Sequence, residues 1–269
     1  MASMADLSPL ESGAPRIGKV WLVGAGPGAA DLMTVRAARL VAAAEVIVHD
    51  GLVDGEVLAM ARPDARLISV AKQRSRHSMA QEDINALLVS EALAGRDVVR
   101  LKGGDPFIFG RGGEEAEACD AAGVPVEVVP GISAAMACAA QAQMPLTHRE
   151  SASAVTFVAG QCKGLTDQDW SGLAGHGRTL VIYMGVATAN DIADKLIADG
   201  VDPALPVAVL QSGGRSSFKA YRSLLADLGG MVARERVKSP ALLVIGDVAR
   251  RGNSIDSLKL LKQQADALQ

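Results

Sequence analysis

The chain has 269 residues, which at roughly 150 residues per domain allows one large domain or two modest ones. A net charge of -3 and a pI of about 5.8 argue against a surface drawn as a whole to nucleic acid or anionic lipid. Hydrophobic residues make up 49% and aromatic residues 3%, and no apolar run reaches the ~18 residues of a membrane span. We therefore expect a globular cytoplasmic protein that binds neither membranes nor nucleic acid.

Residues 1–17 carry Asp6 and Glu11 without a hydrophobic segment, so they are interpreted as a flexible leader rather than a secretory signal. Short β-branched runs then alternate with longer Ala- and Leu-rich stretches, a pattern typical of α/β folds with largely parallel strands. Strands are predicted near 19–25, 45–50, 66–70, 97–101 and 126–130, with helices near 34–43, 78–94 and 112–122.

A polar, proline-initiated stretch at 145–153 is the best candidate for a domain boundary. The second half then predicts strands near 154–160, 179–185, 206–213 and 241–248, and a helix near 187–200. The expected architecture is α/β, with two α/β lobes and mainly parallel sheets. The expected division is an N-terminal domain at 18–147, a C-terminal domain at 148–250 and a polar tail at 251–269.

The cysteines and histidines do not have the spacing of a metal site. Cys119, Cys138 and Cys162 are too far apart for a CxxC motif, and their odd number favours reduced thiols. The four histidines form no HxxxH or HExxH pair. We expect no metal.

The segment 23–29, VGAGPGA, follows the first predicted strand and superficially matches the GxGxxA dinucleotide fingerprint. Pro27 removes one backbone donor, and Asp31 and Thr34 suggest that the next helix opens later than in a dinucleotide fold. Asp50 nevertheless ends the second strand, so an NAD-dependent oxidoreductase remains an alternative. A simple glycine turn is a third interpretation.

Two further segments follow predicted strands, where ligands collect in parallel sheets. In 101–115, LKGGDPFIFGRGGEE, adjacent glycines let a ligand approach the backbone and Asp105 offers an acceptor. Asp105 could instead only cap Phe107 or Ile108. After 66–70, a basic cluster suits a ligand with several carboxylates or phosphates, or is a solvated face; it comprises Lys72, Arg74, Arg76 and His77.

From residue 18 to about 248 the chain resembles the uroporphyrinogen-III C-methyltransferases of the tetrapyrrole methylase family. The resemblance is carried by VWLVGAGPGAADLMT, RLKGGDPFIFGRGGEEAEA, EVVPGISAA, PLTHRE and VIYMG. It implies a homodimer that binds S-adenosyl-L-methionine in the cleft between the lobes. It also implies two methyl transfers to uroporphyrinogen III, giving precorrin-2 for cobalamin or sirohaem biosynthesis, with S-adenosyl-L-homocysteine as the other product.

The resemblance also implies roles for individual residues. Contacts to S-adenosylmethionine are expected from Pro27, Gly103, Gly104, Asp105, Ile108, Ser133, Ala134, Met184 and Gly213. Asp50 and Lys72 are expected at the catalytic cleft, Asp50 to stabilise charge on the pyrrole or accept a proton. Because uroporphyrinogen has eight carboxylates, expected substrate partners are Lys72, Arg74, Arg76, Arg111 and Arg149. Alternatively, Ile108 and Met184 belong to the core and Ser133 only caps a helix.

The chain departs from the common family pattern at several positions. Many relatives have Arg where this chain has Gly51, Arg where it has Gln73, and Thr where it has Ser133. The loss of two cations puts individual carboxylate contacts in doubt, whereas Ser133 keeps a hydroxyl. Methylation of another tetrapyrrole and a non-catalytic tetrapyrrole carrier are the remaining alternatives, and an RNA methylase is disfavoured by the acidic pI.

Overall fold

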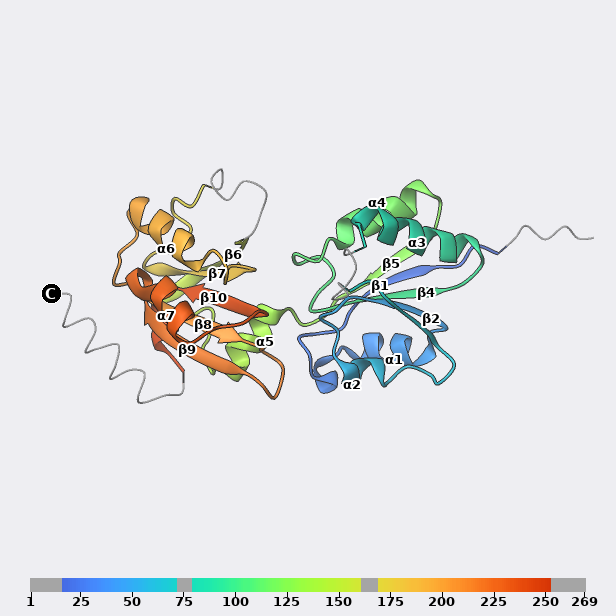
Figure 1. Ribbon diagram of the computed structural model, residues 1–269, viewed down its shortest axis with the longest axis horizontal. Coiled ribbons are helices and arrows are strands. Elements are labelled where there is room, and N and C mark those ends of the chain that lie inside the picture. Colours follow the sequence, from blue (N-terminus) through green and yellow to red (C-terminus); the bar gives the residue numbers. More distant parts are fainter. Residues whose placement is uncertain (1–15, 72–78, 161–168, 253–269) are drawn as a thin grey trace, which may run out of the picture.

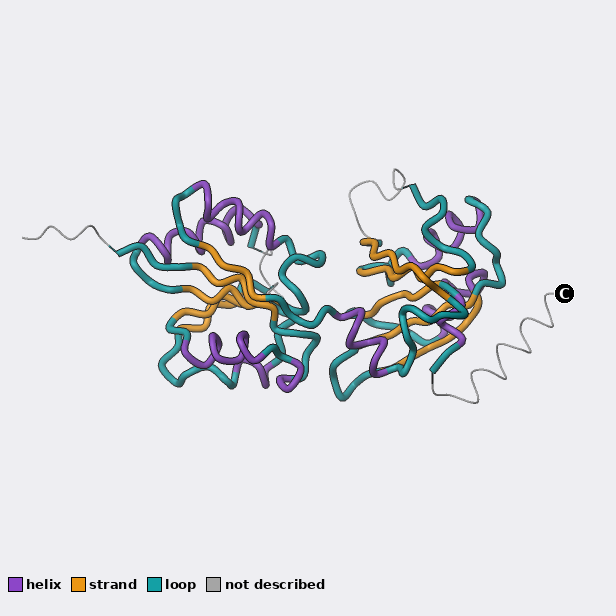
Figure 2. Tube along the Cα trace, turned by 180° about the vertical axis from the view of Figure 1, so that it is seen from behind, coloured by secondary structure: helices purple, strands orange, loops and turns teal. Residues whose placement is uncertain are grey.

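The computed structural model describes residues 16–71, 79–160 and 169–252. Their strands form two five-stranded sheets, one in each half of the chain. The chain passes from the first sheet to the second between strand β5 and helix α5, and the two sheets lie on opposite sides of this passage (Figures 1 and 2).

The first sheet has the strand order β3-β2-β4-β1-β5, and each of its pairings is parallel. Its strands are β1 (Val20–Gly24), β2 (Val46–His49), β3 (Arg66–Ser69), β4 (Val98–Lys102) and β5 (Val126–Val129). Its helices are α1 (Val35–Ala43), α2 (Gly55–Leu58), α3 (Gln81–Leu93) and α4 (Gly112–Ala121). Strands and helices therefore overlap the sequence-based expectations closely, and α2 is an addition.

Helices cover both faces of this sheet, so its central strands are buried, and β4 is apolar apart from Arg100 and Lys102. Val20 and Leu22 of β1 pack with α3 and α4, whereas Val23 packs with α1 and α2 on the other face. Figure 1 shows α3 and α4 on one side of the sheet and α1 and α2 on the other.

Short-range chemistry sets the helix ends. The Thr34 hydroxyl accepts a hydrogen bond from the Ala37 amide at 3.2 Å and so caps α1, as predicted. Gly95 and Gly123 follow α3 and α4 with positive φ angles of 84° and 68°, the left-handed conformation in which glycine ends helices.

The second sheet differs from the expected arrangement. Its order is β6-β7-β10-β8-β9, and only the β6–β7 pairing is parallel among its described strands. The strands are β6 (Ala152–Ala159), β7 (Gly177–Tyr183), β8 (Pro206–Gln211), β9 (Lys219–Leu224) and β10 (Ala241–Ile245). The parallel expectation therefore holds for the first sheet and not for the second, because β8 turns directly back into β9 and β10 inserts antiparallel between β7 and β8.

Helices also cover both faces of the second sheet. Helices α6 (Ala189–Ala198) and α7 (Leu228–Arg234) share one apolar cluster with the sheet. Helix α5 (Ala134–Gln141) packs on the other face through Ala135 and Cys138. The expected helix at 187–200 corresponds to α6, whereas α7 and β9 escaped the sequence analysis.

The elements that the sequence analysis missed lack the usual sequence signals. Strand β9 is an edge strand whose sequence, KAYRSL, is half polar, and α7 contains Gly229 and Gly230, which disfavour a helix. Strand β6 begins at Ala152, inside the stretch expected to be a boundary. In the described part of the chain, no helix is both long enough and apolar enough to cross a bilayer.

Three glycines let the strand ends of the first sheet approach one another. A Cβ atom on Gly24 would lie 2.5 Å from the Gly131 nitrogen and 2.6 Å from the Gly104 oxygen. A Cβ on Gly131 would likewise collide with the Gly104 oxygen and lie 2.8 Å from the Gly24 Cα. The end of β1 and the segments after β4 and β5 are therefore in backbone contact. A side chain on Gly24 or Gly131 would prevent this contact.

Replacement of Gly131 by Ala should lower the free energy of unfolding by about 2–3 kcal/mol, because backbone must move to admit the methyl group. Gly113 is the matched control, since its Cβ position in α4 is open. Gly113→Ala should be neutral or stabilise by up to about 1 kcal/mol. Urea denaturation of both variants checks this, and equal midpoints would contradict the close-approach interpretation.

Candidate active site

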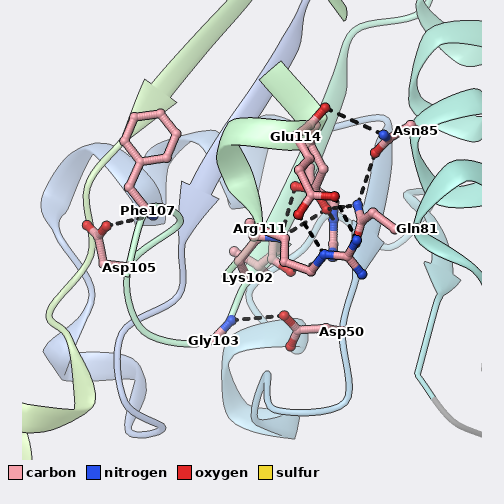
Figure 3. A network of polar contacts seen from close by, with 12 residues as sticks. Asp50, Gln81, Asn85, Lys102, Gly103, Asp105, Phe107, Arg111 and Glu114 are labelled. Atoms are coloured by element: carbon pink, nitrogen blue, oxygen red, sulfur yellow. Dashed lines mark hydrogen bonds and ion pairs between the residues drawn. The ribbon is translucent and has the colours of Figure 1, made fainter. Parts of the chain in front are cut away.

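Asp50 connects the ends of two neighbouring strands. It follows β2, is half-buried, and accepts a hydrogen bond from the Leu52 amide at 3.0 Å through Oδ1. Its Oδ2 accepts from the Gly103 amide, just beyond β4, at 3.3 Å. Figure 3 shows the Asp50 carboxylate aimed at the Gly103 nitrogen. The two residues predicted to share a cleft therefore lie side by side.

The loop from Gly103 to Arg111 is fixed by Asp105. Its Oδ1 accepts from the Phe107 amide at 2.9 Å, which is the capping interaction considered from sequence (Figure 3). Its Oδ2 accepts from the Gly131 amide at 3.0 Å, across to the segment that follows β5. Asp105 thus has a structural role in holding two loops together. Ile108 lies half-buried in the same loop.

A buried ion cluster lies beneath this loop. Glu115 of α4 is fully buried and accepts hydrogen bonds from Lys102 Nζ at 2.9 Å to both carboxylate oxygens. Arg100 Nε also donates to Glu115, at 2.9 Å. Lys102 and Glu115 flank the loop in sequence, so their ion pair closes its two ends against each other.

The cluster holds one carboxylate against two cations. Burial and the neighbouring Arg100 charge lower the pKa of the Lys102 ammonium, whereas the Glu115 and Asp50 carboxylates oppose this effect. Asp50 therefore lies in the field of a buried positive charge, at the strand end where sequence analysis expected a catalytic carboxylate.

The start of α5 meets the second sheet through Tyr183, the last residue of β7. The hydroxyl oxygens of Tyr183 and Ser133 lie 2.6 Å apart, and the Ala135 amide donates to the Tyr183 oxygen at 3.1 Å. The Tyr183 ring also packs on Phe109 of the 103–111 loop, with ring centroids 4.9 Å apart. Ser133 makes no side-chain cap on its helix, so the capping alternative for Ser133 is wrong.

The loops after β7 and β8 complete the surroundings. Met184 follows Tyr183, is 46% exposed and has a positive φ of 55°, so it is not a core residue. Gly213 packs against Cys138 of α5, and Gly214 packs against Pro27, where side chains would collide. The Ala29 amide donates to the Gly214 oxygen at 2.8 Å. The two lobes are therefore joined here through backbone.

A cavity of about 580 Å³ opens beside these loops. It is bounded by the turn after β1, by one face of α5 and by the loop after β8. Its lining residues include Leu32, Ile132, Met136, Gly214 and Arg215. None of the nine predicted cofactor residues lines it, although Ile132 and Gly214 directly precede or follow Ser133 and Gly213.

The structure brings most of the predicted cofactor residues to one edge and leaves some substrate residues apart. Arg111 is exposed and pairs with Glu114 at 2.6 Å. Arg149 lies just before β6, and the far end of β6 pairs with Tyr183. The length of the strand therefore separates Arg149 from Tyr183 by about 25 Å. Lys72, Arg74, Arg76 and His77 lie outside the described residues.

Sequence reasoning missed three residues of this region, namely Lys102, Glu115 and Tyr183. Lys102 and Glu115 are charged residues in segments that already stood out, but their burial is a property of packing rather than of pattern. Tyr183 stood inside an apolar run and carried no signal beyond a tyrosine at the end of a strand. A charged residue at the end of a buried parallel strand is the signal that could have identified Lys102.

The Gly104 turn lies beside the start of α5. A Cβ on Gly104 would lie 3.9 Å from both the Ser133 Cα and the Ala134 nitrogen, an ordinary contact distance. Gly104 has a φ of 71°. Positive φ angles also occur at three non-glycine residues, Phe109, Met184 and Ser212. Each of these is a predicted cofactor residue or directly adjoins one in the sequence. Strained backbone of this kind concentrates at ligand sites.

Comparison with known proteins identifies relatives of the chain. Residues 19–229 match the profile of the Tetrapyrrole (Corrin/Porphyrin) Methylases. A siroheme synthase of Methylococcus capsulatus is 52% identical over 236 residues, which cover 87% of this chain and 50% of the relative. A siroheme synthase of Gluconacetobacter diazotrophicus is 48% identical over 251 residues, covering 93% and 53%. The chain spans about half the length of these curated relatives.

A solved structure resembles the whole fold. It is the uroporphyrin-III C-methyl transferase of Thermus thermophilus complexed with S-adenyl homocysteine, 36% identical with a TM-score of 0.74. The match covers 90% of this chain and 100% of that one. The chain belongs to the tetrapyrrole methylase family.

Replacement of Glu115 by Gln should lower the free energy of unfolding by about 3–5 kcal/mol, because it leaves Lys102 and Arg100 buried without a counter-ion. The neighbouring Glu114 pairs with Arg111 in solvent, so Glu114→Gln should leave stability near that of the wild type. Thermal unfolding of the two variants provides the comparison. A Glu115→Gln variant as stable as Glu114→Gln would contradict the importance of the buried pair.

Cys119 and Cys138 are free and buried, and burial raises the pKa of each thiol to about 11. Both thiols therefore stay protonated and shielded at pH 8, where only thiolates react. Alkylation of the native protein by iodoacetamide at pH 8 should leave both unmodified, and unfolding in urea should expose them. Peptide mass mapping checks this, and rapid native alkylation of either residue would be inconsistent with the packing.

Proposed function

We propose that the protein transfers two methyl groups from S-adenosyl-L-methionine to uroporphyrinogen III, giving precorrin-2 and S-adenosyl-L-homocysteine. The observation that carries the proposal is the convergence of Asp50, the Gly103–Asp105 turn, Ser133 and Met184 at one edge of the two sheets. The structural relative named for this reaction spans most of the chain, and the siroheme synthases support the same chemistry.

The main task of the protein is to position S-adenosylmethionine and the substrate relative to each other. S-adenosylmethionine supplies an already electrophilic methyl group on a sulfonium. We propose that Pro27, Gly103, Gly104, Asp105, Ile108, Ser133, Ala134, Met184 and Gly213 hold it, with contacts made largely through backbone. Orientation of two reactants in this manner is worth up to ~7–11 kcal/mol in well-aligned systems.

Asp50 is the proposed catalytic carboxylate. Methylation of a pyrrole carbon places positive charge on the ring nitrogen, and a proton must later leave the macrocycle. Asp50 is half-buried beside the Gly103 turn, so it can stabilise that charge or accept the proton. The Asp50 carboxylate also interacts electrostatically with the buried Lys102 ammonium.

The substrate carboxylates need cations at the mouth of the site. Arg111 is exposed at the end of the glycine-rich loop and suits this role. Lys72, Arg74 and Arg76 are proposed to act from the basic segment, Lys72 also in catalysis. Arg149 lies at the other end of the second sheet, so a role for it requires a different approach of the substrate or a second copy of the chain.

Three broader proposals accompany the reaction. We propose a homodimer, a cytoplasmic location and a division of the chain into domains at 18–147 and 148–250. The two separate sheets support the division, and the acidic composition supports the absence of nucleic-acid partners.

An NAD-dependent oxidoreductase is less well supported. The turn after β1 leads into a short 3-10 turn at Ala30–Leu32, and α1 begins only at Val35. The Gly26 and Ala29 amides already donate to the oxygens of Gly104 and Gly214. The backbone amides that would donate to a dinucleotide pyrophosphate are therefore already hydrogen-bonded within the protein.

Anaerobic incubation with uroporphyrinogen III and methyl-labelled S-adenosylmethionine tests the reaction by mass spectrometry of the tetrapyrrole. Two added methyl groups are expected. Binding of S-adenosylmethionine without transfer would favour another tetrapyrrole substrate or a carrier. Binding of NADH without S-adenosylmethionine would favour the oxidoreductase.

Asp50→Asn should lower turnover at least tenfold, because the amide cannot take a proton or offset positive charge. Affinity for S-adenosylhomocysteine should change less than threefold, since one side-chain oxygen remains to accept from Leu52 or Gly103. Steady-state kinetics together with calorimetric binding separates the two effects. Normal turnover in this variant would exclude Asp50 as the catalytic carboxylate.

A further inference from the structure

The hydroxyl of Tyr183 replaces the expected cap at the start of α5. A serine that precedes a helix usually accepts a hydrogen bond from the backbone amide two or three residues further on. Ser133 occupies that position but makes no such bond. The Ala135 amide donates instead to the Tyr183 oxygen at 3.1 Å. The side chain of Ser133 is thereby released from the role that its position would normally give it.

The donors and acceptors in this group permit an order in which Tyr183 donates to Ser133. A backbone amide only donates, so the Tyr183 oxygen is the acceptor from Ala135 and its own hydrogen is left to donate. Ser133 Oγ lies 2.6 Å from that oxygen and is an acceptor within reach. When Tyr183 donates to Ser133, the hydrogen of Ser133 is directed away from Tyr183. A chain of hydrogen bonds aligned in this way is polarised along its length.

The surroundings hold Tyr183 in the state that this order requires. Burial raises the pKa of its hydroxyl, so the group keeps its proton throughout the neutral and mildly alkaline range. The ring packs against Phe109 and Phe157, with ring centroids 4.9 and 6.0 Å away. These contacts restrict movement of the ring and of its hydroxyl.

Ser133 lies beside the Gly104 turn. A Cβ on Gly104 would lie 3.9 Å from both the Ser133 Cα and the Ala134 nitrogen, an ordinary contact distance. Ser133 itself is 6% exposed, so a hydrogen bond formed there is poorly accessible to water. The low local dielectric of such a position strengthens a hydrogen bond made there.

We propose that Tyr183 is a positioning residue that sets the direction of the Ser133 hydroxyl, so that Ser133 donates its hydrogen to an oxygen of bound S-adenosylmethionine. This inference rests on the proposed function, because it takes that ligand to bind at this edge. It assigns no chemical step to Tyr183, which contacts the ligand only through Ser133.

Calorimetric titration with S-adenosylhomocysteine tests the proposal in a double-mutant cycle of Tyr183→Phe and Ser133→Ala. Each single variant should bind about five- to tenfold more weakly than the wild type, the loss expected for one hydrogen bond. The double variant should bind no more weakly than Ser133→Ala alone, because Tyr183 acts through Ser133. Ser133→Thr keeps the hydroxyl and should retain most of the affinity.

The chain offers a matched control in Tyr221, its other tyrosine, which lies in β9. Tyr221→Phe removes the same oxygen from the edge strand β9, which β10 and β8 separate from β7, and should leave affinity unchanged. Tyr183→Phe should raise KM for S-adenosylmethionine with little change in kcat. If Tyr183 had only a structural role, Tyr183→Phe would lower Tm, and its effect on affinity would not depend on Ser133.

Several outcomes would overturn the proposal. Unchanged affinity in Tyr183→Phe would do so, as would losses in the two single variants that multiply in the double variant. Unchanged affinity in Ser133→Ala would do so even if Tyr183→Phe failed to fold. A wild-type protein that does not bind S-adenosylhomocysteine would contradict both the proposed function and this inference. If the wild type binds and methylates but the variants give one of the results above, the proposed function stands and this inference is wrong.

Discussion

The backbone contact among Gly24, Gly104 and Gly131 is the constraint on which the rest of the site depends. It brings the end of β1 and the segments after β4 and β5 closer than any side chain permits. Asp105 can then reach the Gly131 amide, and α5 can begin beside the Gly103–Asp105 turn. Without this approach, the loops of the first sheet and the start of the second lobe would not form a common edge.

Buried polar groups then give that edge its chemical character. The Glu115–Lys102 pair closes the 103–111 loop from below and places positive charge near Asp50. Tyr183 joins the same loop to α5 and β7 through Phe109 and Ser133. These interactions are unequal in kind, because removal of a buried charge partner endangers the fold, whereas removal of the Tyr183 hydroxyl loses its neutral hydrogen bonds to Ser133 and to the Ala135 amide.

Much of the first lobe could be predicted from sequence, because parallel strands covered on both faces leave continuous apolar runs and Thr34 or glycine marks the helix ends. The second lobe was predicted less well: β9 is a half-polar edge strand, and strand direction is set by connections that carry no local pattern. Motifs located Asp50, the Gly103–Asp105 turn and Ser133. They could not show that Asp105 binds Gly131, that Tyr183 caps α5, or that Lys102 and Glu115 are buried, since these depend on residues distant in the sequence.

The central claim is that the ligand binds at the edge formed by Gly104, Ser133 and Met184. The most direct measurement is a crystal structure of the protein with S-adenosylhomocysteine. The claim predicts density for the ligand against the Gly103–Asp105 turn and the start of α5, with the Ser133 hydroxyl donating to it. Density confined to the cavity lined by Met136 and Arg215, with the Gly104 edge empty, would contradict it.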